Sequence, residues 1–337
     1  MASVPRFYKS NIAEGKGILI FSIVLATLLR IVFTLSFDAP EIETSGEYLW
    51  QYIIPFAQNP LYSLIGSSAI VGFMAIFVTH INADFVLIRK RTLLPSAITI
   101  LLFSCHPSFV WITPAYFGIL FMLFITAVLF KSYNETSKAL VAFKATFILA
   151  LGSLFAPALL LYLPLLWIAL ALMRCFNGKS ILASLLGLLI IYFPAFSFYL
   201  FTDNLKGFFQ PFIFLGAEAL KNLPFLSLDT AEWVTLLFSA LLICIIIGDN
   251  YINRHKDKIK VRAYLSLLNF ITIAALALFL FLNITPSVNL YISIGIGSML
   301  LSHFFALADT KRTAVSFYFY MLIYIAVCAS SFYTIIG

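Results

Sequence analysis

The chain has 337 residues, of which 62% are hydrophobic and only 10% are charged. A water-soluble domain is about 45–50% apolar and about 25% charged, so this composition excludes an ordinary soluble enzyme and indicates a membrane protein. Basic loops on one side of a membrane explain the net charge of +7 without a nucleic-acid partner.

Eleven apolar runs follow one another along the chain, and most have the length of a membrane-spanning helix. They predict an all-α, polytopic transmembrane helix bundle that forms a single integral membrane domain. The predicted spans are residues 17–37, 61–88, 93–111, 113–130, 139–156, 158–173, 180–201, 231–248, 263–283, 288–307 and 313–335. The two short runs around Pro157 can alternatively form one re-entrant hairpin. No small-residue cleavage site follows the first run, so we expect an uncleaved span rather than a signal peptide.

The basic residues give the orientation of the bundle. If the N-terminus is cytoplasmic and the spans alternate, 18 of the 21 Lys and Arg fall in cytoplasmic segments. The opposite side holds only Lys206 and Lys221, and Arg30 lies inside the first span. Because Lys and Arg in loops stay on the cytoplasmic side, we expect a bacterial inner-membrane protein with a cytoplasmic N-terminus and an external C-terminus.

The first outer loop, about residues 38–60, is acidic directly after the first span. Its acids are Asp38, Glu41, Glu43 and Glu47. A carboxylate at the membrane surface can deprotonate an acceptor hydroxyl, or it can help bind a divalent cation. Trp50 and the flanking Tyr48 and Tyr52 can stack on a sugar or line a lipid groove. The alternative is that the loop is acidic only because Lys and Arg are excluded from this side.

Arg30 lies about two turns from the outer end of the first span, where an unpaired charge costs a few kcal/mol. A phosphate or carboxylate partner near the acidic loop is one interpretation. The other is that Arg30 extends to the outer headgroups, or forms an internal salt bridge with Asp38 or Glu41.

The second outer loop, about residues 202–230, is rich in phenylalanine and predicts an interfacial helix in the headgroup layer. Such a helix can guide a lipid-linked substrate, with Lys206 and Lys221 as the external cations available to a pyrophosphate. The alternative is an amphipathic connector without a binding role.

Two histidines lie toward the cytoplasmic side. His80 and Asp84 share one helical face, and His303 lies near the inner end of the tenth span. A metal or proton site would need the second and tenth spans to be adjacent, which the sequence does not show, so no metal site is predicted. The four cysteines are scattered without CxxC spacing, as expected for small buried hydrophobes.

Two resemblances accompany these patterns. The stretch over about residues 93–193 includes LLPSAITILLFSCHPSFVWITPAYFGILFMLF and LLGLLIIYFP. It resembles a family of uncharacterised multi-spanning inner-membrane proteins of Bacteroidota, which implies no particular activity. The layout also resembles the membrane core of GT-C glycosyltransferases, in which a long outer loop after the first span bears a catalytic acid. Asp38, Glu41 and Glu43 occupy the matching place, but a paired-acid signature and an extra soluble domain are not found.

The GT-C resemblance implies transfer of a sugar from a polyprenyl-phosphate carrier to a lipid or glycan at the outer face. Asp38 or Glu41 would be the base, and Arg30 would face the carrier phosphate. A transporter or flippase for a lipid-linked or small substrate remains an alternative, with a cavity lined by Arg30 or by His80 and Asp84. A non-catalytic subunit of an envelope assembly is the third interpretation, and its protein partners are not predicted.

Overall fold

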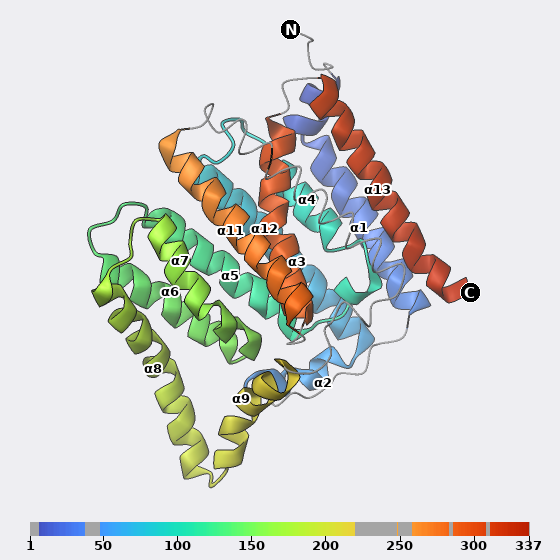
Figure 1. The fold of residues 1–337 in the computed structure, drawn as a ribbon. Helices are drawn as coiled ribbons and strands as arrows, with labels where there is room; N and C mark the ends of the chain where they lie inside the picture. Colours follow the sequence, from blue (N-terminus) through green and yellow to red (C-terminus); the bar gives the residue numbers. More distant parts are fainter. Residues whose placement is uncertain are drawn as a thin grey trace.

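The described part of the chain is mostly helical. The computed structural model describes residues 7–37, 48–219, 248, 258–282, 286–307 and 311–336, and it contains no strand within these ranges. The expected all-α class therefore holds for this part of the chain, and Figure 1 shows the helices packed as a bundle.

The bounds of the helices follow the chain order. The α-helices are α1 (Gly17–Ser36), α2 (Ile54–Ala57), α3 (Pro60–Phe85), α4 (Leu94–Leu102), α5 (Pro114–Lys131), α6 (Lys138–Ser153), α7 (Tyr162–Leu172), α8 (Gly178–Phe201), α9 (Leu205–Ala219), α11 (Ile259–Phe281), α12 (Pro286–Ala306) and α13 (Lys311–Ile336). The shorter helical turns are η1 (Tyr8–Ala13), η2 (Trp50–Tyr52), η3 (Pro107–Phe109) and η4 (Pro157–Leu161).

Proline and asparagine determine where several helices begin. Pro60 and Pro114 are the first residues of α3 and α5, where the missing N–H of proline costs no helical hydrogen bond. Asn59 accepts hydrogen bonds from the first turn of α3, and Asn177 accepts one from Ser180 at the start of α8. These residues start new helices inside a sequence that is apolar almost throughout.

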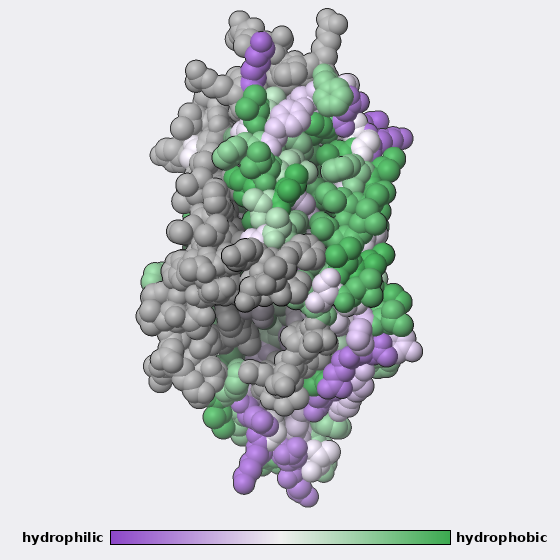
Figure 2. Space-filling model, turned by 90° about the vertical axis from the view of Figure 1, so that its right-hand side faces the viewer, coloured by the Kyte–Doolittle hydropathy of each residue, from purple (hydrophilic) through white to green (hydrophobic). Residues whose placement is uncertain are grey.

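Six described helices are long and apolar enough to cross a membrane, namely α1, α3, α5, α8, α11 and α12. Figure 2 shows hydrophobic residues over the middle of one face of the molecule and hydrophilic residues toward its two ends, over the coloured part of the surface. Such a band between two polar ends is what a bilayer requires of a spanning protein. The chain is thus an all-helical membrane protein in its described part.

Helix α12 lies in the centre of the bundle, where it contacts α4, α5 and α11. Small residues allow this close approach, because a Cβ added to Gly295 would lie 2.4 Å from Ile119 Cδ1 of α5. Thr99 of α4 and Ser298 of α12 share a hydrogen bond of 2.9 Å between their hydroxyl oxygens. Small residues and hydroxyl groups therefore stabilise these helix contacts. Large apolar side chains alone would give little preference for packing on another helix over packing on lipid.

Helices α8 and α9 form the edge of the bundle. Helix α8 packs along α6, and a Cβ added to Gly187 would lie only 2.9 Å from the carbonyl oxygen of Phe143. Beyond the end of α8 the chain turns, and α9 runs back toward η4 and α2 (Figure 1). The structure thus has a helix at the start of the second outer loop, where the sequence predicts an interfacial helix.

The helices differ from the predicted spans mainly at 93–111. The helical part of this run, α4, has nine residues and a length of about 14 Å, too short for the hydrocarbon core of about 30 Å. An irregular segment that includes η3 continues it to the start of α5. The predicted span 231–248 lies outside the described residues, apart from Gly248.

Candidate functional site

The four acids of the first outer loop lie within residues 38–47, and this stretch is called the acidic loop below. Asp38, Glu41 and Glu43, like Lys221 of the second outer loop, lie outside the described residues. The flanking residues Phe37 and Tyr48 are described, and each has defined contacts. The structure therefore shows what the acidic loop is attached to.

Phe37, which precedes the acidic loop, lies at the C-terminal end of α1. Its ring lies 5.9 Å from the ring of Phe33, and both side chains belong to an apolar cluster with Val110 and Trp111. Trp111 and Val110 come from the irregular segment between α4 and α5. The acidic loop thus starts beside that segment.

The second end, Tyr48, is fixed to α9 and α8. Its hydroxyl donates to the carbonyl oxygen of Phe208 at 2.5 Å, and its ring lies 6.1 Å from Tyr192 and 5.7 Å from Tyr199. Burial raises the pKa of the Tyr48 phenol above its ordinary value, so the hydroxyl keeps its proton and remains a donor. The end of the acidic loop is thereby joined to the helix that begins the second outer loop.

Trp50 is buried, whereas Lys206 is exposed to the surface. Trp50 is 1% exposed and packs against Phe117, with 6.2 Å between ring centroids, so its face is not open for stacking on a sugar. Its neighbour Tyr52 is exposed. Lys206 is exposed in the first turn of α9, two residues before Phe208, which places a cation close to the attachment of Tyr48.

Arg30 is buried, with 3% exposure, and its guanidinium binds backbone of the irregular segment. One Nη atom donates to the carbonyl oxygen of Phe103 at 3.0 Å, and the other donates to that of Phe109 at 2.8 Å and to Ser67 Oγ at 2.7 Å. No carboxylate among the described residues forms an ion pair with it. The structure therefore gives Arg30 carbonyl partners that the sequence does not suggest.

Other helices donate to the same segment. Ser67 of α3 donates to the carbonyl oxygen of Val110 at 2.5 Å, and Tyr291 of α12 donates to that of Ser108 at 3.0 Å. The hydroxyl of Tyr116 donates to the carbonyl oxygen of Phe109. We call residues 103–112 the clamped segment. Irregular backbone inside a membrane protein needs such partners, because lipid offers none.

His106 and Ser108 are the polar side chains of the clamped segment nearest its surface. Ser108 is exposed and His106 is half-buried. The backbone N–H of Ser108 donates to His106 Nδ1 at 3.3 Å, and Ser108 Oγ also contacts Nδ1. Nδ1 is therefore the acceptor nitrogen, and the neutral ring carries its proton on Nε2.

His80 and His303 have different surroundings in the structure. His80 Nε2 and Asp84 Oδ2 lie 3.3 Å apart on an exposed face of α3. His303 of α12 instead shares a crevice with Asn82, so α3 and α12 do approach one another there, but through a different face of α3. Within the described ranges, no group of three His, Cys, Asp or Glu side chains could hold a metal ion.

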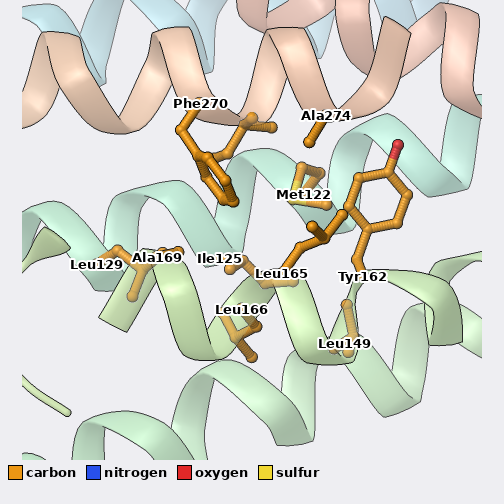
Figure 3. Close-up of a pocket in the computed structure, with 11 residues that line it drawn as sticks. Met122, Ile125, Leu129, Leu149, Tyr162, Leu165, Leu166, Ala169, Phe270 and Ala274 are labelled. Atoms are coloured by element: carbon orange, nitrogen blue, oxygen red, sulfur yellow. The ribbon is translucent and has the colours of Figure 1, made fainter. Parts of the chain in front are cut away.

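A second crevice, with a volume of only about 20 Å³ open to a water-sized sphere, lies between α5, α7 and α11 (Figure 3). Met122, Leu166 and Phe270 are among its apolar lining residues, and Tyr162 turns its hydroxyl away to donate to Asn289 Oδ1 at 2.9 Å. Neither this crevice nor the one beside His303 is lined by Arg30, His80 or Asp84. The crevices thus do not coincide with the residues expected to line a transport path.

Sequence reasoning missed the role of the clamped segment. The signal that could have found it is Pro107, flanked by His106 and Ser108, since a proline within an apolar run marks a break. Its partners Ser67, Tyr116 and Tyr291 come from three other helices, and no local pattern identifies them. No protein-family model, curated protein or solved structure matches this chain, so a function can be argued only from its own residues.

Proposed function

We propose that this chain is a glycosyltransferase of a bacterial inner membrane, with a GT-C-like layout, that takes a sugar from a polyprenyl-phosphate carrier at the outer face. The observation that supports this proposal most is the attachment of the acidic loop at both ends. Phe37 packs beside the clamped segment, and Tyr48 donates to Phe208 of α9. The two residues that flank the acidic stretch are therefore attached to the clamped segment and to α9, the elements from which the proposed site would be built.

The proposed chemistry uses one carboxylate as a base. Asp38 or Glu41 accepts the proton of the acceptor hydroxyl as its oxygen attacks the sugar carbon, and the carrier phosphate leaves. Glu43 is the third acid of the same loop. A divalent cation held by these acids, with carbonyl oxygens and water, is an additional proposal that would balance the charge of the phosphate.

The composition of α9 favours a lipid-linked substrate. Its exposed residues include Phe209, Phe212 and Ile213, and its first turn carries the exposed Lys206. A helix with large apolar side chains and a cation is suited to lie in the headgroup layer, where a carrier lipid holds its phosphate. We propose that Lys206, together with Lys221, supplies the cations near that phosphate.

The test is a comparison of lipid extracts from cells. A deletion strain that lacks the gene should lose a glycolipid, detected by mass spectrometry, and the wild-type chain should restore it. Asp38→Asn or Glu41→Gln should reduce the product at least about a hundredfold, the usual contribution of a positioned base, at unchanged protein level. Asp84→Asn, which removes an exposed carboxylate of α3, is the matched control and should restore the product fully.

Normal product in Asp38→Asn, in Glu41→Gln and in the double variant would remove the proposal. Loss of product in Asp84→Asn as well would show that the readout reports general damage rather than the loss of a base.

A further inference from the structure

Two loops are joined at the end of the bundle that the sequence predicts to be cytoplasmic, namely the loop between α5 and α6 and the loop between α7 and α8 (Figure 1). Cys175 Sγ donates to the carbonyl oxygen of Ser132 at 2.9 Å, and Ser180 Oγ donates to the carbonyl oxygen of Cys175 at 3.0 Å. The backbone N–H of Asn134 donates to the carbonyl oxygen of Met173 at 3.2 Å. Ser132, Cys175 and Ser180 are buried, so the two loops form one surface over them.

Three basic side chains lie at exposed positions of this surface. Lys131, Arg174 and Lys179 each directly precede one of the three buried residues in the chain. Because hydrogen bonds hold those neighbours together, the three cations gather at one place, and we call them the basic patch. Glu135 lies in the first of the two loops, but neither it nor any other carboxylate of the described ranges forms an ion pair with the patch.

Arg174 occupies a position at which glycine is preferred. Its φ of 61° lies in the left-handed region. The backbone N–H of Arg174 donates to the carbonyl oxygen of Ala171 at 3.0 Å, and that of Cys175 donates to that of Leu170 at 2.8 Å. This pattern ends a helix with a left-handed residue, which is usually glycine because a Cβ makes the conformation costly. The presence of arginine therefore indicates that its guanidinium has a use.

The helix ends at this surface do not neutralise the basic patch. Helices α5 and α7 end there, whereas α6 and α8 begin there. Each helix end carries a partial charge of about half a unit, negative where a helix ends and positive where it begins, so the four contributions largely cancel. The three full positive charges of the patch remain, and they favour an anionic ligand.

Apolar side chains are exposed directly beside the basic patch. Leu172 and Phe176 lie two residues before and after Arg174, and Leu182 lies three residues after Lys179. In a bilayer the phosphate of a lipid lies at the headgroup level and its acyl chains lie beneath, so one lipid can contact cations and apolar side chains together. A soluble anion would use the cations alone.

We propose that the basic patch binds the headgroup of an anionic phospholipid in the leaflet on this side of the membrane, with the acyl chains along the exposed apolar residues of α7 and α8. Charge complementarity requires an anion, and the adjacent apolar surface favours a lipid. The inference goes beyond the proposed glycosyltransferase activity, which concerns the other end of the bundle, and it does not depend on that activity.

The test measures lipid binding to the full chain in neutral detergent by calorimetry. The probes are dioctanoyl phosphatidylglycerol, dioctanoyl phosphatidylcholine and glycerol 3-phosphate. Arg174→Gly with Lys179→Gln removes two cations of the patch. Lys90→Gln with Arg91→Gln, in the loop between α3 and α4, removes the same charge from the same predicted side and is the matched control.

We expect saturable binding of phosphatidylglycerol to the wild-type chain and a loss of about thirtyfold in the patch variant, since each cation near an anionic headgroup contributes about fivefold. The control should lose less than about threefold, because salt screens exposed charges that are not at the site. Equal losses in the two variants would overturn the inference. Binding of phosphatidylcholine or of glycerol 3-phosphate as tight as that of phosphatidylglycerol would also overturn it, in favour of unspecific apolar contact or of a soluble-anion site.

Arg174→Gly alone separates binding from folding. Because glycine adopts the left-handed conformation without strain, this variant should unfold in detergent at the same temperature as the wild type or higher, yet bind phosphatidylglycerol about fivefold more weakly. Wild-type affinity in this variant would contradict the role of the guanidinium. If its unfolding midpoint falls instead, Lys131→Gln with Lys179→Gln replaces it in the test, with the same thirtyfold loss expected and unchanged binding as the contrary result.

Discussion

At the scale of single residues, Arg30 joins α1 to the clamped segment and to α3. Its planar guanidinium reaches two carbonyl oxygens and one hydroxyl at once, from Phe103, Phe109 and Ser67. A lysine has three donors on one nitrogen and cannot reproduce this fork. The identity of the side chain, and not only its charge, is therefore needed here.

Arg30→Lys should lower the free energy of unfolding by about 1–3 kcal/mol, because the charge stays buried while at least one acceptor loses its donor. The measurement is denaturant or thermal unfolding of the purified chain in detergent. Arg91→Lys, at an exposed loop position, is the matched control and should change the stability by less than about 0.5 kcal/mol. Equal stability of the two variants would show that the fork is not required.

The sequence shows that Arg30 is a charge inside an apolar run, but it does not show which groups bind the guanidinium. A charge in an apolar run is visible at once, and phosphate, carboxylate and headgroup were all reasonable expectations. Phe103 and Phe109 lie 73 and 79 positions further along the chain, and backbone carbonyls carry no sequence signal. The position of His106 was unpredictable for the same reason, because it depends on how four helices bind one segment.

At the scale of elements, apolar runs locate most helices well. Helix α1 (Gly17–Ser36) and helix α5 (Pro114–Lys131) lie within a few residues of the predicted spans, since run length and proline determine their ends. The apolar run 93–111 wrongly predicts one continuous span. Hydrophobicity indicates burial in lipid or in protein, but it does not show whether the helix is continuous. Here almost all of α4 is buried among α1, α3 and α12, so an apolar sequence is needed although the helix is short.

Contacts between elements depend on particular glycines. Gly187→Ala should destabilise the packing of α8 on α6 by about 1–3 kcal/mol, since its Cβ would lie 2.9 Å from the backbone oxygen of Phe143, which cannot move aside as a side chain can. Gly72→Ala in α3 is the control, because an added Cβ there meets nothing within 4 Å. It should be neutral or slightly stabilising, as alanine favours helix. The measurement is the thermal unfolding midpoint of each variant. Equal midpoints for Gly187→Ala and Gly72→Ala would contradict the expectation.

At the scale of the whole molecule, the distribution of basic residues predicts an odd number of crossings. A reporter at the N-terminus should therefore respond from the cytoplasm and one at the C-terminus from outside. Paired fusions to alkaline phosphatase, which is active only outside, and to green fluorescent protein, which is fluorescent only inside, measure this. Both termini reporting from one compartment would show that the predicted number of crossings is wrong by an odd number, and every segment after the error would lie on the opposite side from the one assigned.

The hydrogen bonds of Arg30 have a consequence for biosynthesis. A ribosome that has just delivered α1 to the insertion machinery has not yet made Phe103 or Phe109, which follow 73 and 79 residues later. During that interval the guanidinium must be shielded by something other than its final partners, such as water in the insertion channel or a chaperone. The first helix can be released into the bilayer at low cost only after its acceptors have been translated, which couples the timing of its release to the synthesis of a distant part of the chain.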